Sequence, residues 1–158
     1  MIKKLEEDSI LEAIKLMDIA TKQTFTHSIV IKRNEARWIK FLISIVQEQA
    51  KDNPNFLAIG EYQNDELRGF LLANTFINHY SDEPIMDVKD CIVDFEKSTP
   101  YTVVRLYDYM MDHLRKHGGK RWRADSIRNQ EDTLKYAKLL QHKYNAELFY
   151  AAHGNIGE

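Results

Sequence analysis

The sequence has little of what small proteins use to hold a fold together covalently. Its single cysteine, Cys91, leaves it without an internal disulfide bond. Its cysteine and histidine residues show no spacing typical of a zinc site, so we expect no metal. No apolar run approaches the ~20 residues of a membrane span, and the first residues lack the apolar stretch of a signal peptide. These absences predict a protein of the reducing cytoplasm, or of a particle assembled there, without a membrane partner.

Proline and glycine are also scarce, with 3 and 6 residues respectively, and no stretch of the chain is rich in both. No internal repeat or low-complexity segment divides the sequence. Its 158 residues, 44% hydrophobic and 29% charged, fit one globular domain of ordinary size. We therefore predict a single domain over residues 1–158, with residues 153–158 as a loose tail.

Neither sign of charge dominates, because the formal net charge is only −2. This balance disfavours a protein that coats nucleic acid. The exception is a basic segment with Asp125 as its one acidic residue; it contains Arg115, Lys116, Lys120, Arg121, Arg123 and Arg128. The segment is either a solvated basic face or a site for a phosphorylated ligand.

What the sequence does contain is a clear succession of strand and helix patterns. Apolar spacing and capping residues predict, in order, a strand at 2–5, helices at 10–20 and 34–53, strands at 56–62, 67–76 and 85–95, a helix at 102–117, a strand at 121–127, a helix at 130–143 and a strand at 146–152. A three-stranded meander followed by strand, helix and strand predicts an α/β (α+β) fold. We expect a mixed, mostly antiparallel central sheet with helices on both faces.

This order of elements resembles the GNAT (N-acetyltransferase superfamily) fold over nearly the whole chain, most clearly in the C-terminal half. There a helix ends at Gly118–Gly119, a strand follows, and Asn129 leads a helix that carries Tyr136 seven residues later. In the family this tyrosine often protonates the departing thiolate of coenzyme A, and the asparagine contacts the pantetheine arm. The resemblance thus implies acetyl-CoA as co-substrate, Tyr136 as general acid and Asn129 as a cofactor contact. A helix cap and a core tyrosine explain the same pair.

The sequence departs from the family pattern at the phosphate loop. The family has Arg/Gln-x-x-Gly-x-Gly/Ala, whose backbone N–H groups hold the pyrophosphate. At the matching place this chain has Lys-Ser-Thr-Pro-Tyr-Thr, residues 97–102, without either glycine and with Pro100 lacking an N–H group. Four residues remain as candidate cofactor contacts: Lys97, Ser98, Thr99 and Thr102. The same residues also form an ordinary helix start that needs no ligand.

An N-acyltransferase needs a group that takes the proton of the attacking amine, directly or through water. The candidate bases are Glu61 in the hairpin and Asp90 and Asp94 in the third strand. Alternation predicts that Asp90 and Asp94 share one face of that strand with Met86, Val88 and Ile92. Each carboxylate, taken singly, is equally compatible with a solvated surface position.

The resemblance also implies contacts for the coenzyme itself. Strand N–H groups around Cys91, Ile92 and Val93 are the candidates to polarise the thioester carbonyl, and Arg123 and Arg128 are the candidates for the phosphates. By residue type alone, Cys91 is better interpreted as a small buried hydrophobe than as a nucleophile. His113 and His117 share a helix face at i, i+4, a spacing that suits the negative end of a helix better than a metal.

Two functions of different class follow. The preferred one is an acyl-CoA-dependent N-acyltransferase that moves an acetyl or related acyl group to a primary amine of a small molecule or protein. The alternative is a non-catalytic GNAT-fold module, a structural or protein-interaction part of the kind that phages and some cellular complexes use. The missing glycines favour the second. A homo-oligomer or larger assembly stays open, and the fold itself does not decide between the two functions.

Overall fold

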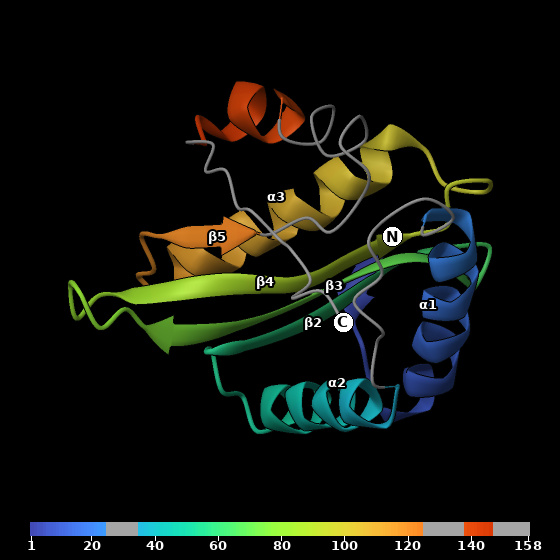
Figure 1. Ribbon diagram of the computed structural model, residues 1–158, viewed down its shortest axis with the longest axis horizontal. Helices are drawn as coiled ribbons and strands as arrows, with labels where there is room; N and C mark the ends of the chain where they lie inside the picture. The colour runs from blue at the N-terminus through green and yellow to red at the C-terminus, as the bar shows by residue number, and fades with distance from the viewer. Residues whose placement is uncertain (25–34, 125–137, 147–158) are drawn as a thin grey trace, which may run out of the picture. The chain divides into compact units, whose positions relative to one another are not determined.

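The computed structural model describes residues 1–24, 35–124 and 138–146 (Figure 1). The chain falls into two units, Met1–Asp125 and Ser126–Glu158. The first unit contains β1 (Ile2–Lys4), a 3₁₀ turn at Glu7–Ser9, α1 (Ile10–Thr24), α2 (Glu35–Ala50), β2 (Phe56–Gln63), β3 (Glu66–Ile77), β4 (Pro84–Val93), α3 (Pro100–Lys116) and β5 (Trp122–Ala124). In the second unit, the described part is a helix over residues 138–144 and the two residues after it.

The predicted elements within these ranges are confirmed, with shifts at their ends. The third strand was expected to reach residue 95 but ends at Val93, and the helix expected from residue 102 begins at Pro100. The strand expected at 121–127 is seen over Trp122–Ala124. The remainder of that strand, residues 130–137 of the next helix and residues 147–152 of the last strand lie outside the described residues.

The sheet has the order β1-β2-β3-β4-β5. The first four strands pair antiparallel, and β5 joins β4 in parallel, so the expectation of a mixed, mostly antiparallel sheet is confirmed. The tight β2–β3 hairpin follows from two turn residues, Asn64 and Asp65, which both adopt positive φ angles of 51° and 59°. Such a turn matches the twist of the flanking strands, and asparagine and aspartate tolerate it best after glycine.

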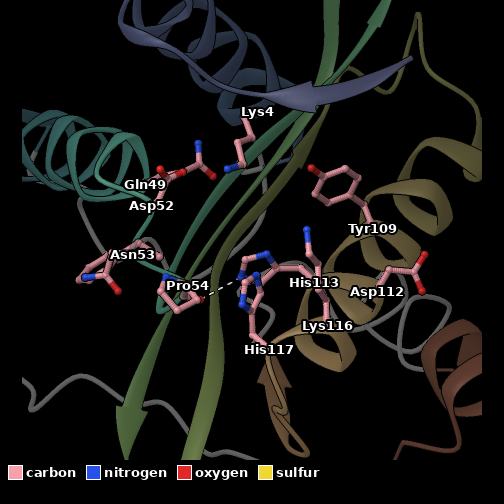
Figure 2. Close-up of a pocket in the computed structure, with 11 residues that line it drawn as sticks. Lys4, Gln49, Asp52, Asn53, Pro54, Tyr109, Asp112, His113, Lys116 and His117 are labelled. Carbon is pink, nitrogen blue, oxygen red and sulfur yellow. Dashed lines mark hydrogen bonds between the residues drawn. The ribbon is translucent and has the colours of Figure 1, made fainter.

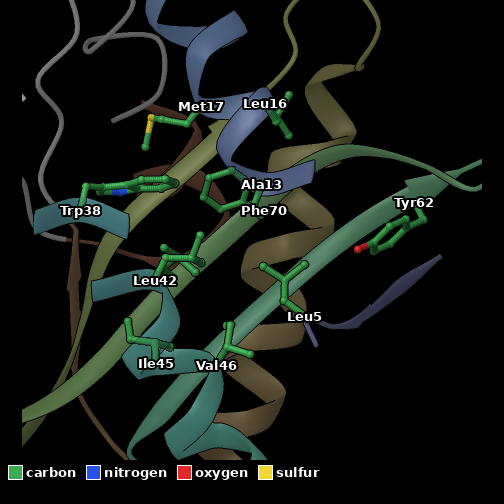
Figure 3. Close-up of a cluster of buried hydrophobic side chains, with 12 residues drawn as sticks. Leu5, Ala13, Leu16, Met17, Trp38, Leu42, Ile45, Val46, Tyr62 and Phe70 are labelled. Atoms are coloured by element: carbon green, nitrogen blue, oxygen red, sulfur yellow. The ribbon is translucent and has the colours of Figure 1, made fainter. Parts of the chain in front are cut away.

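Helices cover both faces of this sheet, as expected (Figure 1). On one face α1 and α2 bury a cluster that includes Leu16, Leu42 and Phe70 (Figure 3). On the other face α3 buries Leu106, Tyr107 and Met110, none of which has exposed surface. Because apolar surface removed from water is the main favourable term in folding, these two layers hold the sheet from both sides.

The helix α3 comes unusually close to the sheet at Gly69 of β3. A Cβ atom at this glycine would lie 2.9 Å from the Thr102 Cγ2 atom and 2.9 Å from the Val93 Cγ1 atom. The other end of the helix is closed by Gly118, whose φ of 73° suits a residue without a side chain. The start of α3 is therefore fixed against the ends of β3 and β4.

One irregularity in β4 overturns the expected arrangement of its faces. The pairing with β3 passes from Ala73↔Val88 to Leu72↔Asp90, so Lys89 is an extra residue in a β-bulge. Before the bulge, Met86 and Val88 face α3; after it, Asp90 and Ile92 face α1 and α2. The prediction of one common face was wrong, because alternation assumes a regular strand and the bulge reverses it. Asp94 lies beyond the end of β4.

No helix in the described part of the chain has the length and apolar character to cross a bilayer.

Candidate active site

Asp90 lies just after the bulge, on the face of β4 that α1 and α2 cover. The indole N–H of Trp38 in α2 donates a hydrogen bond to its Oδ2 atom at 2.9 Å. Trp38 is itself 9% exposed and packs on the ring of Phe70, with 6.2 Å between the ring centroids. A half-buried carboxylate is thus fixed by a neutral donor at the edge of the core.

Glu61 lies on the opposite face and is tied to α3. It is 5% exposed, and its Oε1 atom accepts a hydrogen bond from the Nε atom of Arg105. Burial raises the pKa of Glu61, but hydrogen bonds from Arg105 and Thr102 outweigh it, so its pKa lies below the ordinary value. This carboxylate stays ionised and joins β2 to α3, which makes it a poor proton acceptor near neutral pH.

Asp94 organises the loop between β4 and α3. Its Oδ1 atom accepts hydrogen bonds from the backbone N–H groups of Glu96, at 3.0 Å, and Lys97, at 3.3 Å. Its backbone carbonyl accepts a third from the N–H of Ser98 at 2.7 Å. Asp94 is only 5% exposed, so a buried negative charge lies directly against three successive residues of the loop.

The loop therefore does not fit the pyrophosphate of coenzyme A as it stands. The GNAT loop that the sequence resembles would hold that group with backbone N–H donors, but here Asp94 already engages those of Glu96, Lys97 and Ser98. Pro100 has no N–H to offer, and the carboxylate of Asp94 would repel a second anion. We assign no phosphate contact to this loop.

The predicted contact residues of the loop have other roles. Lys97 lies 3.9 Å from the carboxylate of Glu66, with both side chains about 60% exposed. Thr99 precedes α3 in an extended conformation but makes no side-chain cap hydrogen bond. Thr102 is 2% exposed, and its hydroxyl oxygen lies 3.5 Å from the Nη2 atom of Arg105. Ser98 is half-buried.

The three residues expected at the thioester lie at the end of β4. Ile92 packs against the core beneath α1 and α2, whereas Val93 is buried on the α3 side. Cys91, paired with Leu71 of β3, is half-buried. The pairs described between β4 and β5 run from Met86 to Val88, so these three residues follow the segment that β5 covers.

Asp87 is a buried carboxylate that the sequence did not single out. It is 2% exposed and receives two hydrogen bonds from Arg123: the Nε atom lies 3.0 Å from Oδ1, and the Nη2 atom 3.1 Å from Oδ2. Lys89 also pairs with Asp87. Burial raises the pKa of Asp87, but the hydrogen bonds from Arg123 and Lys89 outweigh it and leave the pKa below its ordinary range.

Arg123 was a candidate for the coenzyme phosphates, and this bidentate pair competes with that role. Its guanidinium also lies over the ring of Phe76, 4.7 Å from the centroid. The only sequence signal for this arrangement was an aspartate between two apolar residues of a strand, opposite a basic strand. Tyr136, Asn129 and Arg128 lie outside the described residues, so their roles stay predictions.

The described ranges contain no group of three or more histidine, cysteine, aspartate or glutamate residues that could hold a metal ion. The two histidines of α3 have a different arrangement. The Nε2 atom of His113 lies 2.9 Å from the carbonyl oxygen of Pro54, and the His117 ring lies 4.6 Å from the His113 ring, centroid to centroid.

No protein-family model matches the sequence, and a search of curated proteins finds no match. Solved structures do resemble it. An aminoglycoside acetyltransferase from an uncultured soil metagenomic sample, in complex with trehalose, has a TM-score of 0.68 at 15% identity and covers 100% of this chain and 96% of that one. The PaiA N-acetyltransferase of Thermoplasma acidophilum, in complex with coenzyme A, has a TM-score of 0.71 at 16% identity, covering 88% and 87%.

A third structure is the ribosomal-protein-alanine N-acetyltransferase of Brucella melitensis biovar Abortus 2308, with a TM-score of 0.66 at 14% identity over 98% of both chains. Two of the three names state a substrate, and these differ: an aminoglycoside and a ribosomal-protein alanine. At these identities the likeness extends to the fold alone.

Proposed function

Because this chain has the GNAT fold, we propose that it is an N-acyltransferase that moves an acetyl or related acyl group from coenzyme A to a primary amine. One observation carries the proposal. The β4 bulge turns Asp90 toward the α1–α2 face, where the Trp38 indole holds its carboxylate at 2.9 Å. This position offers a fixed proton acceptor at the side of the central strand.

Asp90 is the best candidate base because the other carboxylates of the site accept hydrogen bonds from cations or from loop N–H groups. Arg105 engages Glu61, the loop N–H groups engage Asp94, and Arg123 and Lys89 engage Asp87. Hydrogen bonds from cations hold the pKa values of Glu61 and Asp87 below their ordinary ranges, so these two carboxylates are poor proton acceptors. Asp90 takes a proton from the ammonium or attacking amine, directly or through one water.

The coenzyme supplies the acyl thioester. This chain supplies position and charge: strand residues 91–93 border the reacting group, and Asp90 orients a cationic amine before it accepts the proton. Tyr136 remains the proposed donor of the proton to the leaving group. Since two of the similar structures are acetyltransferases of aminoglycosides and of ribosomal-protein alanine, the proposed acceptor class is a primary amine of a small molecule or protein.

The second candidate is a non-catalytic module, and the loop at Asp94 favours it. A loop that binds its own carboxylate has no need of a phosphate to be ordered. In that case the sheet and helices serve as a structural or protein-interaction part, and Asp90 is a half-buried hydrogen-bond acceptor that fixes Trp38.

Calorimetric titration with acetyl-CoA and with free coenzyme A separates the two functions. Under the first proposal, the folded protein binds acetyl-CoA at micromolar to sub-millimolar concentration and releases free thiol in the presence of an amine panel. Absence of binding at millimolar coenzyme, with a cooperatively folded protein, would reject the enzyme and favour the module.

The variant Asp90→Asn then tests the base. We expect it to lower turnover by ~100-fold or more while acetyl-CoA affinity changes by less than ~3-fold. The matched control is Asp65→Asn in the exposed β2–β3 turn, where asparagine also tolerates the positive φ angle. Equal turnover in Asp90→Asn and the control would remove Asp90 from the mechanism.

A further inference from the structure

A pocket opens at the end of α3 far from the Asp94 loop (Figure 2). It has a volume of about 360 Å³, within the usual range of small-molecule sites. Its walls are the last turns of α3, the turn between α2 and β2, and the end of β1. At about 1.5 Å of rise per residue, the first turn of α3 and Lys116 are roughly 20 Å apart, so this pocket is separate from the acyl-transfer site.

Two lysines give the pocket its charge. Lys4 extends from β1 and Lys116 from α3, and Figure 2 shows the two side chains on different walls of the pocket, the Lys116 amine beside the His113 ring and the Lys4 amine toward Gln49. Neither lysine has an ion-pair partner in the part of the chain that the structure describes. Unpaired ammonium groups around one cavity raise its potential and attract an anion.

The acidic residues of the lining do not cancel this charge. Asp112 pairs with Arg115 at 2.7 Å, and its carboxylate points away from the pocket in Figure 2. Asp52, in the α2–β2 turn, is then the one remaining carboxylate of the lining against two lysines. The lining therefore carries a net positive charge.

The other lining groups suit a ligand with an anionic end and a carbon skeleton. The half-buried phenol of Tyr109 offers a hydroxyl donor, and Phe56 and Pro54 supply an apolar wall. A phosphate monoester carries about −1.5 to −2 charges at neutral pH and three acceptor oxygens, which matches two ammonium groups and one hydroxyl. We propose that this pocket binds a small phosphorylated molecule, with its phosphate between Lys4 and Lys116.

His113 couples this site to pH. A carbonyl oxygen only accepts hydrogen bonds, so the contact with Pro54 requires the proton on Nε2 and leaves Nδ1 as the titrating atom. Burial lowers the pKa of His113, the hydrogen bond to the Pro54 carbonyl raises it, and the positive charges of His117, Lys4 and Lys116 lower it, so that the pKa lies below its ordinary value. The charged and titratable groups around its ring are Tyr109, Asp112, Lys116 and His117 from α3, Lys4 from β1 and Asp52 from the turn.

A bound phosphate offsets the repulsion from the two lysines, so it raises the pKa of His113. By linkage, binding then takes up a proton at His113, and this contribution favours binding as the pH falls toward the titration range of histidine. The direction is the opposite of what a site that needs neutral histidine, such as a metal site, would show.

The test is titration of the whole protein with inorganic phosphate and with glycerol phosphate, followed by calorimetry and by the imidazole NMR signals. We expect millimolar or tighter binding that weakens roughly 5-fold or more in Lys4→Ala and in Lys116→Ala. Lys51→Ala is the matched control, because Lys51 is an exposed lysine near this turn that pairs with Glu48 outside the lining. It should bind like the wild type.

His113→Gln keeps a donor for the Pro54 carbonyl but does not titrate in this range, so its affinity for phosphate should gain less than the wild-type affinity as the pH falls; the titration of phosphate itself is common to both proteins. Three results would overturn the proposal: no binding at tens of millimolar phosphate, equal weakening in Lys51→Ala, or succinate binding as tightly as glycerol phosphate. The first denies a site, the second indicates bulk charge, and the third indicates a site for dianions in general. None of these depends on acyltransferase activity.

Discussion

At the scale of single residues, four carboxylates near the sheet show that partners and not residue type set a role. Glu61, Asp87 and Asp94 are each held by cations or by backbone N–H groups. The indole N–H of Trp38 is one of the groups that contact Asp90. The same carboxylate group therefore forms structural ion pairs at Glu61 and Asp87, accepts loop N–H groups at Asp94 and is the candidate base at Asp90.

Glu61→Gln tests the structural ion pair. We expect a loss of about 1 to 3 kcal/mol in the free energy of unfolding at neutral pH, discounted because Arg105 is 48% exposed. Because folding lowers the pKa of Glu61, its contribution is full above the unfolded value and is lost as the pH falls through the folded one. Urea denaturation should therefore show the difference between wild type and variant shrinking below about pH 4.3. A difference independent of pH would contradict the ion pair.

Asp94→Asn tests whether the loop excludes phosphate by its charge. The amide oxygen of asparagine still accepts from the N–H groups of Glu96 and Lys97, but the negative charge is gone. If the coenzyme phosphates lie near this loop, acetyl-CoA affinity should rise by roughly 5-fold, measured by calorimetry. The affinity for S-acetyl pantetheine, which has no phosphate, is the control and should not change. An unchanged acetyl-CoA affinity would place the phosphates elsewhere.

At the scale of elements, the bulge at Lys89 is the feature that positions the candidate base. Without the bulge, β4 would continue its regular alternation. Lys89 instead of Asp90 would then pair with Leu72 and face α1 and α2. Bulges also bend a strand and increase its twist, so the additional residue affects how the Asp90 carboxylate lies against Trp38.

Deletion of Lys89 tests this role. The flanking pairs Ala73↔Val88 and Leu72↔Asp90 then become consecutive, so the strand keeps its hydrophobic register and the protein should fold. We expect a loss of stability of no more than about 2 kcal/mol by urea denaturation, but a fall in turnover of ~100-fold or more. Lys89→Ala, which keeps the bulge and removes only the amine bound to Asp87, should retain most activity. Equal activity in the two variants would show that the bulge is dispensable.

At the scale of the whole molecule, charge is balanced overall but unequal locally. The formal net charge is −2 and the sequence pI about 6.3, while Lys4 and Lys116 make one pocket positive. The net charge governs solubility, and the local charge governs which ligands a site attracts.

Solubility should consequently reach its minimum near pH 6.3, because proteins associate most readily when their net charge approaches zero. Precipitation by polyethylene glycol at a series of pH values measures it. Added phosphate should shift this minimum little, since one bound dianion changes the net charge modestly. A minimum far from pH 6.3 would indicate that a surface patch controls association.

The sequence by itself predicted the elements, their order and the mixed sheet, because apolar periodicity and turn residues are local signals. The turn residues Asn64 and Asp65 predicted the hairpin, and Gly118 predicted the end of α3. The absence of the two loop glycines could also be seen directly in the sequence. These features depend on residues that are close in the chain, so tertiary contacts refined their ends without changing their identity.

Only the tertiary structure decided which face each side chain takes and which partner it meets. The bulge at Lys89 has no sequence pattern of its own. Because of it, Asp90 faces α1 and α2, whereas Met86 and Val88, predicted on the same face as Asp90, face α3. The pairs Trp38 with Asp90 and Arg123 with Asp87 join residues far apart in sequence. The pocket between Lys4 and Lys116 likewise joins the start of the chain to α3. Periodicity describes a regular element, whereas function here depends on an irregular strand and on contacts that folding alone brings together.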